Sequence, residues 1–148
     1  MAPTDATDRF SAEERAAMKQ RAAELKAAKG RGSGAKRAAA DAQDCIDQIA
    51  GMPDADRVIA EAVHAIVAEH APDLAPRTWY GMPAYARDGK VVVFFKPAAK
   101  FKVRYAEVGF NESANLDDGQ MWPTVFAVTS VSPQIEEALT ALVRKAVG

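Results

Sequence analysis

The stretch Tyr85-Ala-Arg-Asp-Gly-Lys-Val-Val-Val-Phe-Phe95 decides the fold of this chain. Its second half, Val91–Phe95, is a run of β-branched and aromatic residues, which favours a β-strand. The Asp88-Gly89 pair before that run is a strong hairpin signal, because glycine accepts the positive φ that a tight turn requires. Pro97 ends the strand, because proline lacks the amide donor of a sheet ladder. The stretch therefore predicts an antiparallel hairpin.

Two further segments on the C-terminal side of this hairpin have strand character. Residues 101–108 alternate apolar and polar side chains, which predicts a half-buried strand. Residues 125–129 read Val-Phe-Ala-Val-Thr, and Pro123 just before them indicates a strand start or a sheet edge. With the hairpin, these segments predict an antiparallel sheet of about four strands.

Helices are predicted on both sides of the sheet region. Apolar residues recur at helical spacing over 45–52 and again over 58–67, and Ser132 with Pro133 begins a last amphipathic helix. No strand–helix–strand alternation occurs, so the pattern does not favour a parallel doubly wound sheet. We expect residues 41–148 to form a two-layer α+β domain, with helices packed on one face of the antiparallel sheet.

Residues 1–40 differ from the rest in charge and composition. They carry nine Lys and Arg against five Asp and Glu, whereas residues 41–148 carry ten against fifteen. Ser11 with Glu14 forms a capping box, so a helix is predicted from there to about Lys29. Few large apolar residues lie on that helix, and a glycine-rich linker follows it. We interpret residues 1–40 as a helical arm, either solvated or lying by its basic face on the body or on a partner.

The overall composition is that of one globular domain. The chain has 148 residues, 49% of them hydrophobic and 26% charged, with a net charge of −1. The sequence has no apolar run of about 18 residues and no signal-peptide pattern at its start, and its single cysteine, Cys45, excludes an internal disulfide. These features predict a soluble cytoplasmic protein with no membrane association. The balanced charge and the lack of an RNA-binding motif make nucleic acid an unfavoured partner.

The segment Arg77-Thr-Trp-Tyr-Gly-Met-Pro-Ala-Tyr85, followed by a strand, an Asp-Gly turn and a second strand, resembles the YdhG-like family of small bacterial domains. The resemblance covers roughly residues 41–148 and implies the same α+β fold. Most of that family has no known function. One member has been described as a frataxin-like intracellular iron chaperone, so the resemblance implies iron handling as an alternative function. No iron ligand of the family maps onto a particular residue of this chain.

Two features of the sequence suggest a pocket for a small anionic ligand. Residues 79–85 place four large amphipathic side chains within seven positions, which is typical of a pocket wall, although such aromatics also form rigid connectors in a core. If Lys102 and Arg104 share a strand face, they project together toward the ligand, although lysines also guard edge strands. The predicted pocket brings Tyr85 and Lys102 into one concavity. The predicted ligand-binding residues are Trp79, Tyr80, Met82, Tyr85, Lys96, Lys102, Arg104 and Tyr105.

The iron alternative requires a cluster of exposed carboxylates, because oxygen ligands suit hard cations. The only group with that character comprises Glu107, Glu112, Asp117 and Asp118. Its spacing does not match a calcium-binding loop, and Asp117-Asp118-Gly119 is typical of a turn. The histidines offer little, since His64 lies about 150° from the apolar stripe of its helix and is expected to be exposed. Cys45 is expected to be a buried small hydrophobe.

The sequence lacks the motifs of common enzymes. It has no Gly-x-Ser-x-Gly elbow, no phosphate-binding loop and no dinucleotide fingerprint. An acid–base role for Tyr80 or Tyr105 with Lys102 is left open. We therefore favour a non-enzymatic binding protein that needs no cofactor. The alternatives are the iron chaperone and a protein-interaction module that uses the basic arm.

Overall fold

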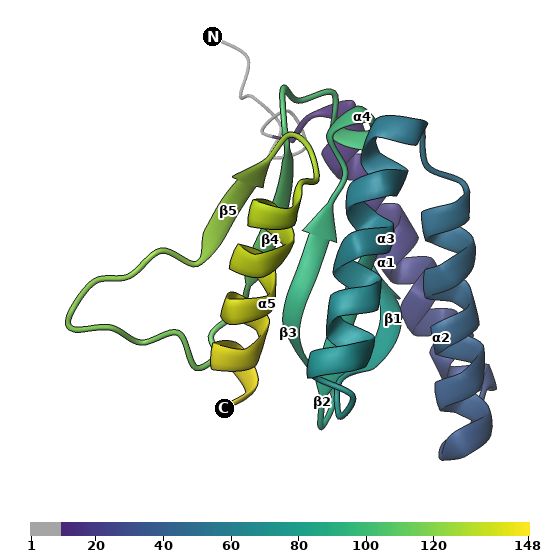
Figure 1. Cartoon of the computed structure of the whole chain (residues 1–148). Coiled ribbons are helices and arrows are strands. Elements are labelled where there is room, and N and C mark those ends of the chain that lie inside the picture. The colour runs from purple at the N-terminus through teal and green to yellow at the C-terminus, as the bar shows by residue number, and fades with distance from the viewer. Residues whose placement is uncertain (1–9) are drawn as a thin grey trace, which may run out of the picture.

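The computed structural model describes residues 10–148, which form a single five-stranded antiparallel sheet with helices packed against it (Figure 1). The strands lie in chain order, each pairing with the next, so every connection joins neighbouring strands. They are β1 (Ala75–Trp79), β2 (Met82–Arg87), β3 (Lys90–Lys96), β4 (Ala106–Phe110) and β5 (Val125–Val128). The helices are α1 (Ala12–Gly30), α2 (Ala35–Ala50), α3 (Asp54–His70), α4 (Ala98–Phe101) and α5 (Pro133–Val147). The α+β class is thus confirmed.

The predicted hairpin is present as β2 and β3, with Asp88 and Gly89 at the turn in positive φ. The sheet has one strand more than expected, because β1 adds to the outer side of β2. Pro76 in β1 pairs in register with Tyr85. A proline is tolerated there because β1 lies at the edge of the sheet.

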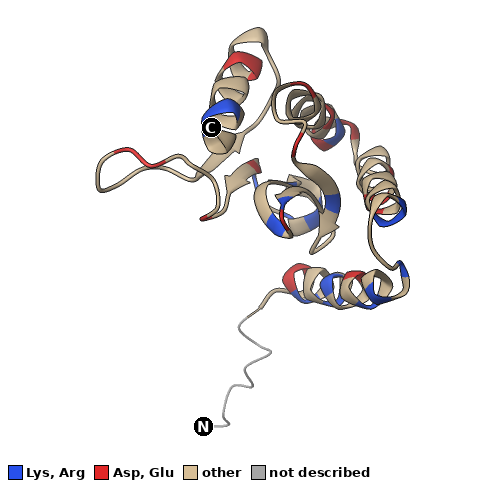
Figure 2. Cartoon of the chain, turned by 90° about the horizontal axis from the view of Figure 1, so that it is seen from below, with Lys and Arg blue, Asp and Glu red and all other residues tan. Residues whose placement is uncertain are grey.

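Three helices, α2, α3 and α5, form a layer on one side of the sheet. Figure 2 shows α5, α3 and α2 side by side around the sheet, with α1 across from α3. The core lies between the sheet and this layer, where α3 contacts α5 and α2 packs along β1. Its largest fully buried side chains include Tyr85, Phe95 and Val63. None of the helices among residues 10–148 has the length and apolar character needed to cross a bilayer.

The strand expected over residues 101–108 is wrong in its first half. The chain forms α4 after Pro97, then turns at Lys102, whose φ of 52° is left-handed, and enters β4 only at Ala106. The carboxylate of Asp56 on α3 explains the helical start, since it accepts the amides of Ala98 and Ala99 at 3.0 Å each. Such a cap satisfies the first free amides of a helix.

The N-terminal helix begins as predicted and lies on the body. Ser11 and Glu14 form the capping box, and Ala17 is the one residue of α1 that is fully buried. The linker is held by Arg31, which contacts carboxylates of Asp41 and Asp44 at 2.7 Å each. Since α2 begins at Ala35, the expected boundary between residues 40 and 41 falls inside a continuous helix.

Candidate functional site

The turn between β1 and β2 is shaped to hold an anion. Tyr80 and Gly81 both adopt left-handed backbone angles, with φ of 54° and 71°, between the paired residues Trp79 and Met82. Positive φ at both central positions is what a two-residue hairpin turn of type I′ requires. Successive amides in such a turn point toward one side and form a concavity that binds anions. The Tyr-Gly pair therefore builds a site from backbone atoms alone.

A carboxylate from α1 lies in this turn. The amide of Tyr80 donates to Oε2 of Glu24 at 3.0 Å, and the amide of Gly81 donates to Oε1 at 2.8 Å. Arg21, one turn earlier on α1, lies 3.3 Å from the same carboxylate and 5.8 Å above the ring of Tyr80. Two amides and a guanidinium thus bind one carboxylate, which is the arrangement of a strong, charge-assisted contact.

Lys100 of α4 lies beside the turn. Its ammonium donates to Oε1 of Gln20 on α1, and a Cβ placed on Gly81 would meet both of these side chains. Burial lowers the pKa of Lys100, and the charge of Glu24 opposes that shift. A cation at this position adds positive potential to the amides of the turn.

Two hollows open next to Lys100 and Glu24. One, of about 430 Å³, lies between α1, α2 and the turn, and the other, of about 400 Å³, lies between α2, α3 and α4. They adjoin at Asp47 and Gln48, which line both. A small molecule bound at the turn would therefore have room beside it.

The structure brings only part of the predicted ligand site together. Tyr80 lies at the turn, and Trp79 packs edge-on against it with ring centroids 5.0 Å apart. Met82 is the first residue of β2, directly after the turn, and its side chain is buried. Tyr85 is 1% exposed in the core, whereas Lys102 is exposed and contacts Glu13 of α1 at 2.9 Å. The prediction that Tyr85 and Lys102 share a concavity is therefore wrong.

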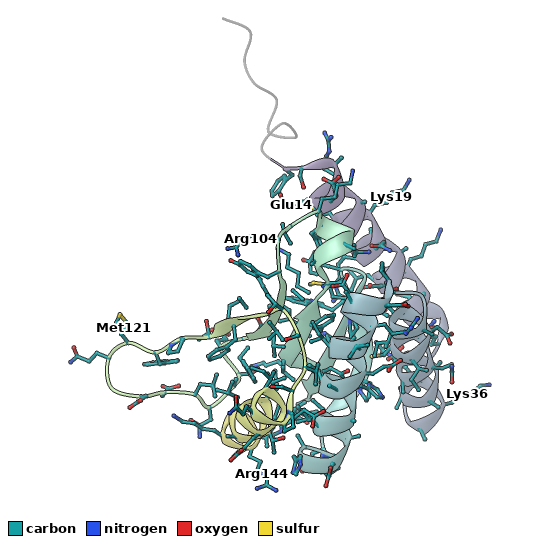
Figure 3. All side chains as sticks on the ribbon, turned by 45° about the horizontal axis from the view of Figure 1, so that its top comes forward. Glu14, Lys19, Lys36, Arg104, Met121 and Arg144 are labelled. Atoms are coloured by element: carbon teal, nitrogen blue, oxygen red, sulfur yellow. The ribbon has the colours of Figure 1, made fainter. Side chains whose placement is uncertain are left out.

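The predicted basic face is also wrong. Lys102 and Arg104 lie in the segment between α4 and β4 and not on a strand, so no sheet face presents them together. Arg104 lies over the ring of Tyr105 at 5.0 Å and points outward in Figure 3. Lys96 lies over the ring of Phe101, also at 5.0 Å. Each of these cations is engaged by a neighbouring aromatic ring or by α1.

Two residues of the site, Glu24 and Gln20, were missed in the sequence because they lie on the arm that was separated from the domain. Lys100 was not among the predicted ligand-binding residues, although it lies between Lys96 and Lys102, which were. The signal that could have found Glu24 is its position: it is the only acidic residue of α1 beyond the first turn, which holds Glu13 and Glu14. No local pattern indicates that it contacts residues 56 and 57 positions away.

The carboxylates required by the iron alternative do not form one site. Glu107 lies in β4 opposite Lys96, while Glu112, Asp117 and Asp118 lie in the long segment between β4 and β5. Among residues 10–148, no group of three or more His, Cys, Asp or Glu side chains is placed to hold a metal ion. The geometry therefore gives the iron reading no assembled ligand set.

His64 was expected to be exposed and is instead half-buried against Tyr85. Its Nδ1 lies 2.9 Å from the hydroxyl of Tyr85. A helical wheel shows only the residues of one helix, so it could not reveal this contact with β2. Burial lowers the pKa of His64. Cys45, expected to be buried, is 0% exposed beside Tyr85, and burial raises the pKa of its thiol to about 11. The three groups therefore stay uncharged at neutral pH, as a polar contact within the core.

We expect acidification to destabilise the protein through His64. Because its pKa is lower in the folded state, the unfolded chain binds more protons, so stability is complete above about pH 6.5 and falls as the pH drops below it. Urea unfolding at pH 7.5 and pH 5.5 measures this change. In H64Q the pH dependence over this interval becomes shallower. An unchanged dependence in H64Q would contradict the assignment.

Comparison with known proteins gives no relative: no family model, no curated protein and no solved structure matches this chain.

Proposed function

We propose that this chain is a non-enzymatic binding protein that recognises a small anionic ligand at the turn between β1 and β2. The observation that carries the proposal is the carboxylate of Glu24, which the amides of Tyr80 and Gly81 hold at 3.0 and 2.8 Å. Glu24 represents the group that an external ligand would present, a carboxylate or a similarly sized anion. Lys100 supplies a cation beside it.

The contacts of α1 suggest that an external anion can displace the carboxylate of Glu24 from the turn. Ala17 alone is fully buried among its residues, while Met18 and Leu25 are 45% and 50% exposed. Burial of apolar area is the main source of stability in helix packing, and α1 buries little of it. The helix is therefore held mainly by polar contacts. The linker after it contains Gly32 and Gly34, both in positive φ. An external anion would thus compete with the carboxylate of Glu24, which is tethered to the same chain and sits on a weakly held helix.

The proposal gives a role to the motif that resembles the YdhG-like family. Tyr80-Gly81-Met82-Pro83 supplies both amides of the turn, and Met82 and Pro83 begin the buried strand that fixes it. Membership of that family is itself part of the proposal. An iron-handling function would need a ligand set that residues 10–148 do not assemble.

The test removes the tethered carboxylate and supplies free ones. We expect E24A to bind succinate or inorganic phosphate at least about tenfold more tightly than the unchanged protein, because the internal competitor is gone. Nitrogen–proton NMR spectra measure this, with saturable shifts of the Tyr80 and Gly81 amides. E137A, which removes an exposed glutamate on α5, should behave as the unchanged protein.

A second variant checks the cation. In E24A/K100A the same titration should be weaker than in E24A, because the ammonium beside the turn is lost. Absence of any amide shift in E24A with either anion, while its circular dichroism matches that of the unchanged protein, would contradict the proposal. Amide shifts that spread over the whole surface, and that are equally large in E24A and in E24A/K100A, would contradict the proposal as well.

A further inference from the structure

The sheet has one covered edge and one open edge. At one side, α2 packs along β1 and α1 lies across the hairpin that β1 begins. At the other side, β5 pairs with β4 and is the last strand of the sheet. Among residues 10–148, no helix lies beyond β5 on its outer side (Figure 1). This edge lies at the opposite side of the sheet from the turn between β1 and β2.

The outer backbone groups of β5 are free to pair. The amide of Phe110 donates to the carbonyl of Thr124, and the register continues with Val108 opposite Phe126. In an antiparallel pair, residues alternate between facing the partner strand and facing away. The amides and carbonyls of Val125, Ala127 and Thr129 therefore point away from β4. No other backbone hydrogen bond among residues 10–148 uses them.

The usual protections of a sheet edge are absent from β5. Natural edge strands carry charges, prolines or bulges that prevent another strand from pairing with them. Residues 124–129 read Thr-Val-Phe-Ala-Val-Thr, without a charge or a proline, and their register with β4 has no bulge. Val125 is 49% exposed, and Ala127 is also exposed. The edge is thus apolar, regular and open.

We propose that this edge pairs with β5 of a second copy of the chain, which joins the two sheets into one antiparallel sheet around a two-fold axis. The three outward-facing residues are spaced symmetrically about Ala127. In an antiparallel pair centred there, Ala127 faces Ala127 of the partner subunit, and Val125 faces Thr129 of the partner subunit. Every outward amide and carbonyl of the strand then gains a partner.

The charge pattern favours a second copy as the occupant. Like charges opposite each other destabilise a strand pair, and β5 presents none to its own copy. The segment between β4 and β5 projects past β5 on this open side, with Met121 at its tip, 89% exposed (Figures 1 and 3). Met121 thus adds exposed apolar area on the side that a second copy would occupy, although Glu112, Asp117 and Asp118 of the same segment also place charge there. A two-fold pair is also the commonest symmetry of homo-oligomers.

Sedimentation velocity over a concentration series tests the proposal on the full chain. We expect the weight-average mass to rise toward twice the monomer mass with concentration. A127K should weaken this association at least about tenfold, because two ammonium groups meet at the axis. A127P removes an outward amide and leaves the amides that face β4, so it should weaken association too. A39K, the same substitution as A127K at an exposed site on α2, should associate normally.

Amide hydrogen exchange supplies a readout that needs no variant. The amides of Val125, Ala127 and Thr129 should become slower to exchange as concentration rises, while those of Phe126 and Val128 stay slow throughout. A chain that stays monomeric across the series overturns the proposal. So does a dimer that A127K leaves unchanged, or one in which the three outward amides exchange at the same rate at every concentration, because a different surface then forms it.

Discussion

Replacing Asp56 by alanine should lower the free energy of unfolding by about 3 kcal/mol, since the carboxylate makes two charge-assisted hydrogen bonds in a buried place. Asp56 is 4% exposed and accepts the amides of Ala98 and Ala99, each at 3.0 Å. Without it, both amides lose their acceptor at the start of α4, where no helical carbonyl replaces it. The loss also loosens the helix that carries Lys100.

Urea unfolding followed by circular dichroism measures the effect of D56A. The matched control is D54A, two positions earlier on the same helix, where the side chain is 90% exposed and forms an ion pair with Arg57. Loss of that surface contact should change the unfolding free energy by about 1 kcal/mol or less. D56N retains an acceptor oxygen and should fall between the two. Equal effects of D56A and D54A would show that the cap of α4 adds no stability.

The second large effect is expected at Gly109 of β4. A Cβ built there would lie 2.6 and 2.7 Å from Cε1 and Cε2 of Phe94, which faces it on β3. The ring of Phe94 is also packed against Trp79, with centroids 5.3 Å apart, so it cannot retreat without disturbing the hairpin that carries the turn. We expect G109A to destabilise the fold by about 2 kcal/mol, a typical result of overpacking.

A double-mutant cycle separates this clash from a general effect of the substitution. If the ring of Phe94 is the obstacle, G109A should cost less when F94A is already present, and the difference is the interaction energy. G30A provides the control, because a Cβ at Gly30 meets nothing within 4 Å and the residue ends a helix. Equal costs of G109A in both backgrounds would contradict the explanation.

Most of the fold could be predicted because its signals are local. The Asp88-Gly89 turn, the β-branched run after it and the caps at Ser11 and Ser132 each act within a few residues. The strand β1 was missed because Ala-Pro-Arg-Thr-Trp shows no alternation and contains a proline. It is a strand because β2 offers it a partner, and tertiary pairing overrides weak local preference.

The candidate site was harder to predict because its contacts are distant in sequence. Tyr80 and Gly81 were recognised as unusual, but the carboxylate that binds them comes from a helix more than fifty residues earlier. The error over residues 101–108 has the same origin, because the cap from Asp56 is 42 positions from Ala98. Tyr85 was assigned to the pocket although it is buried beside His64 on the side of α3.

The burial of Cys45 makes the only thiol of the chain a reporter of structural opening. Alkylating reagents react with the thiolate, and at neutral pH a thiol with a pKa of about 11 and no exposed surface supplies almost none. Labelling must therefore wait until α2 separates from the sheet, so its rate measures how often that separation occurs. Mass spectrometry of the labelled protein can follow this rate in variants such as D56A and G109A, without an added probe.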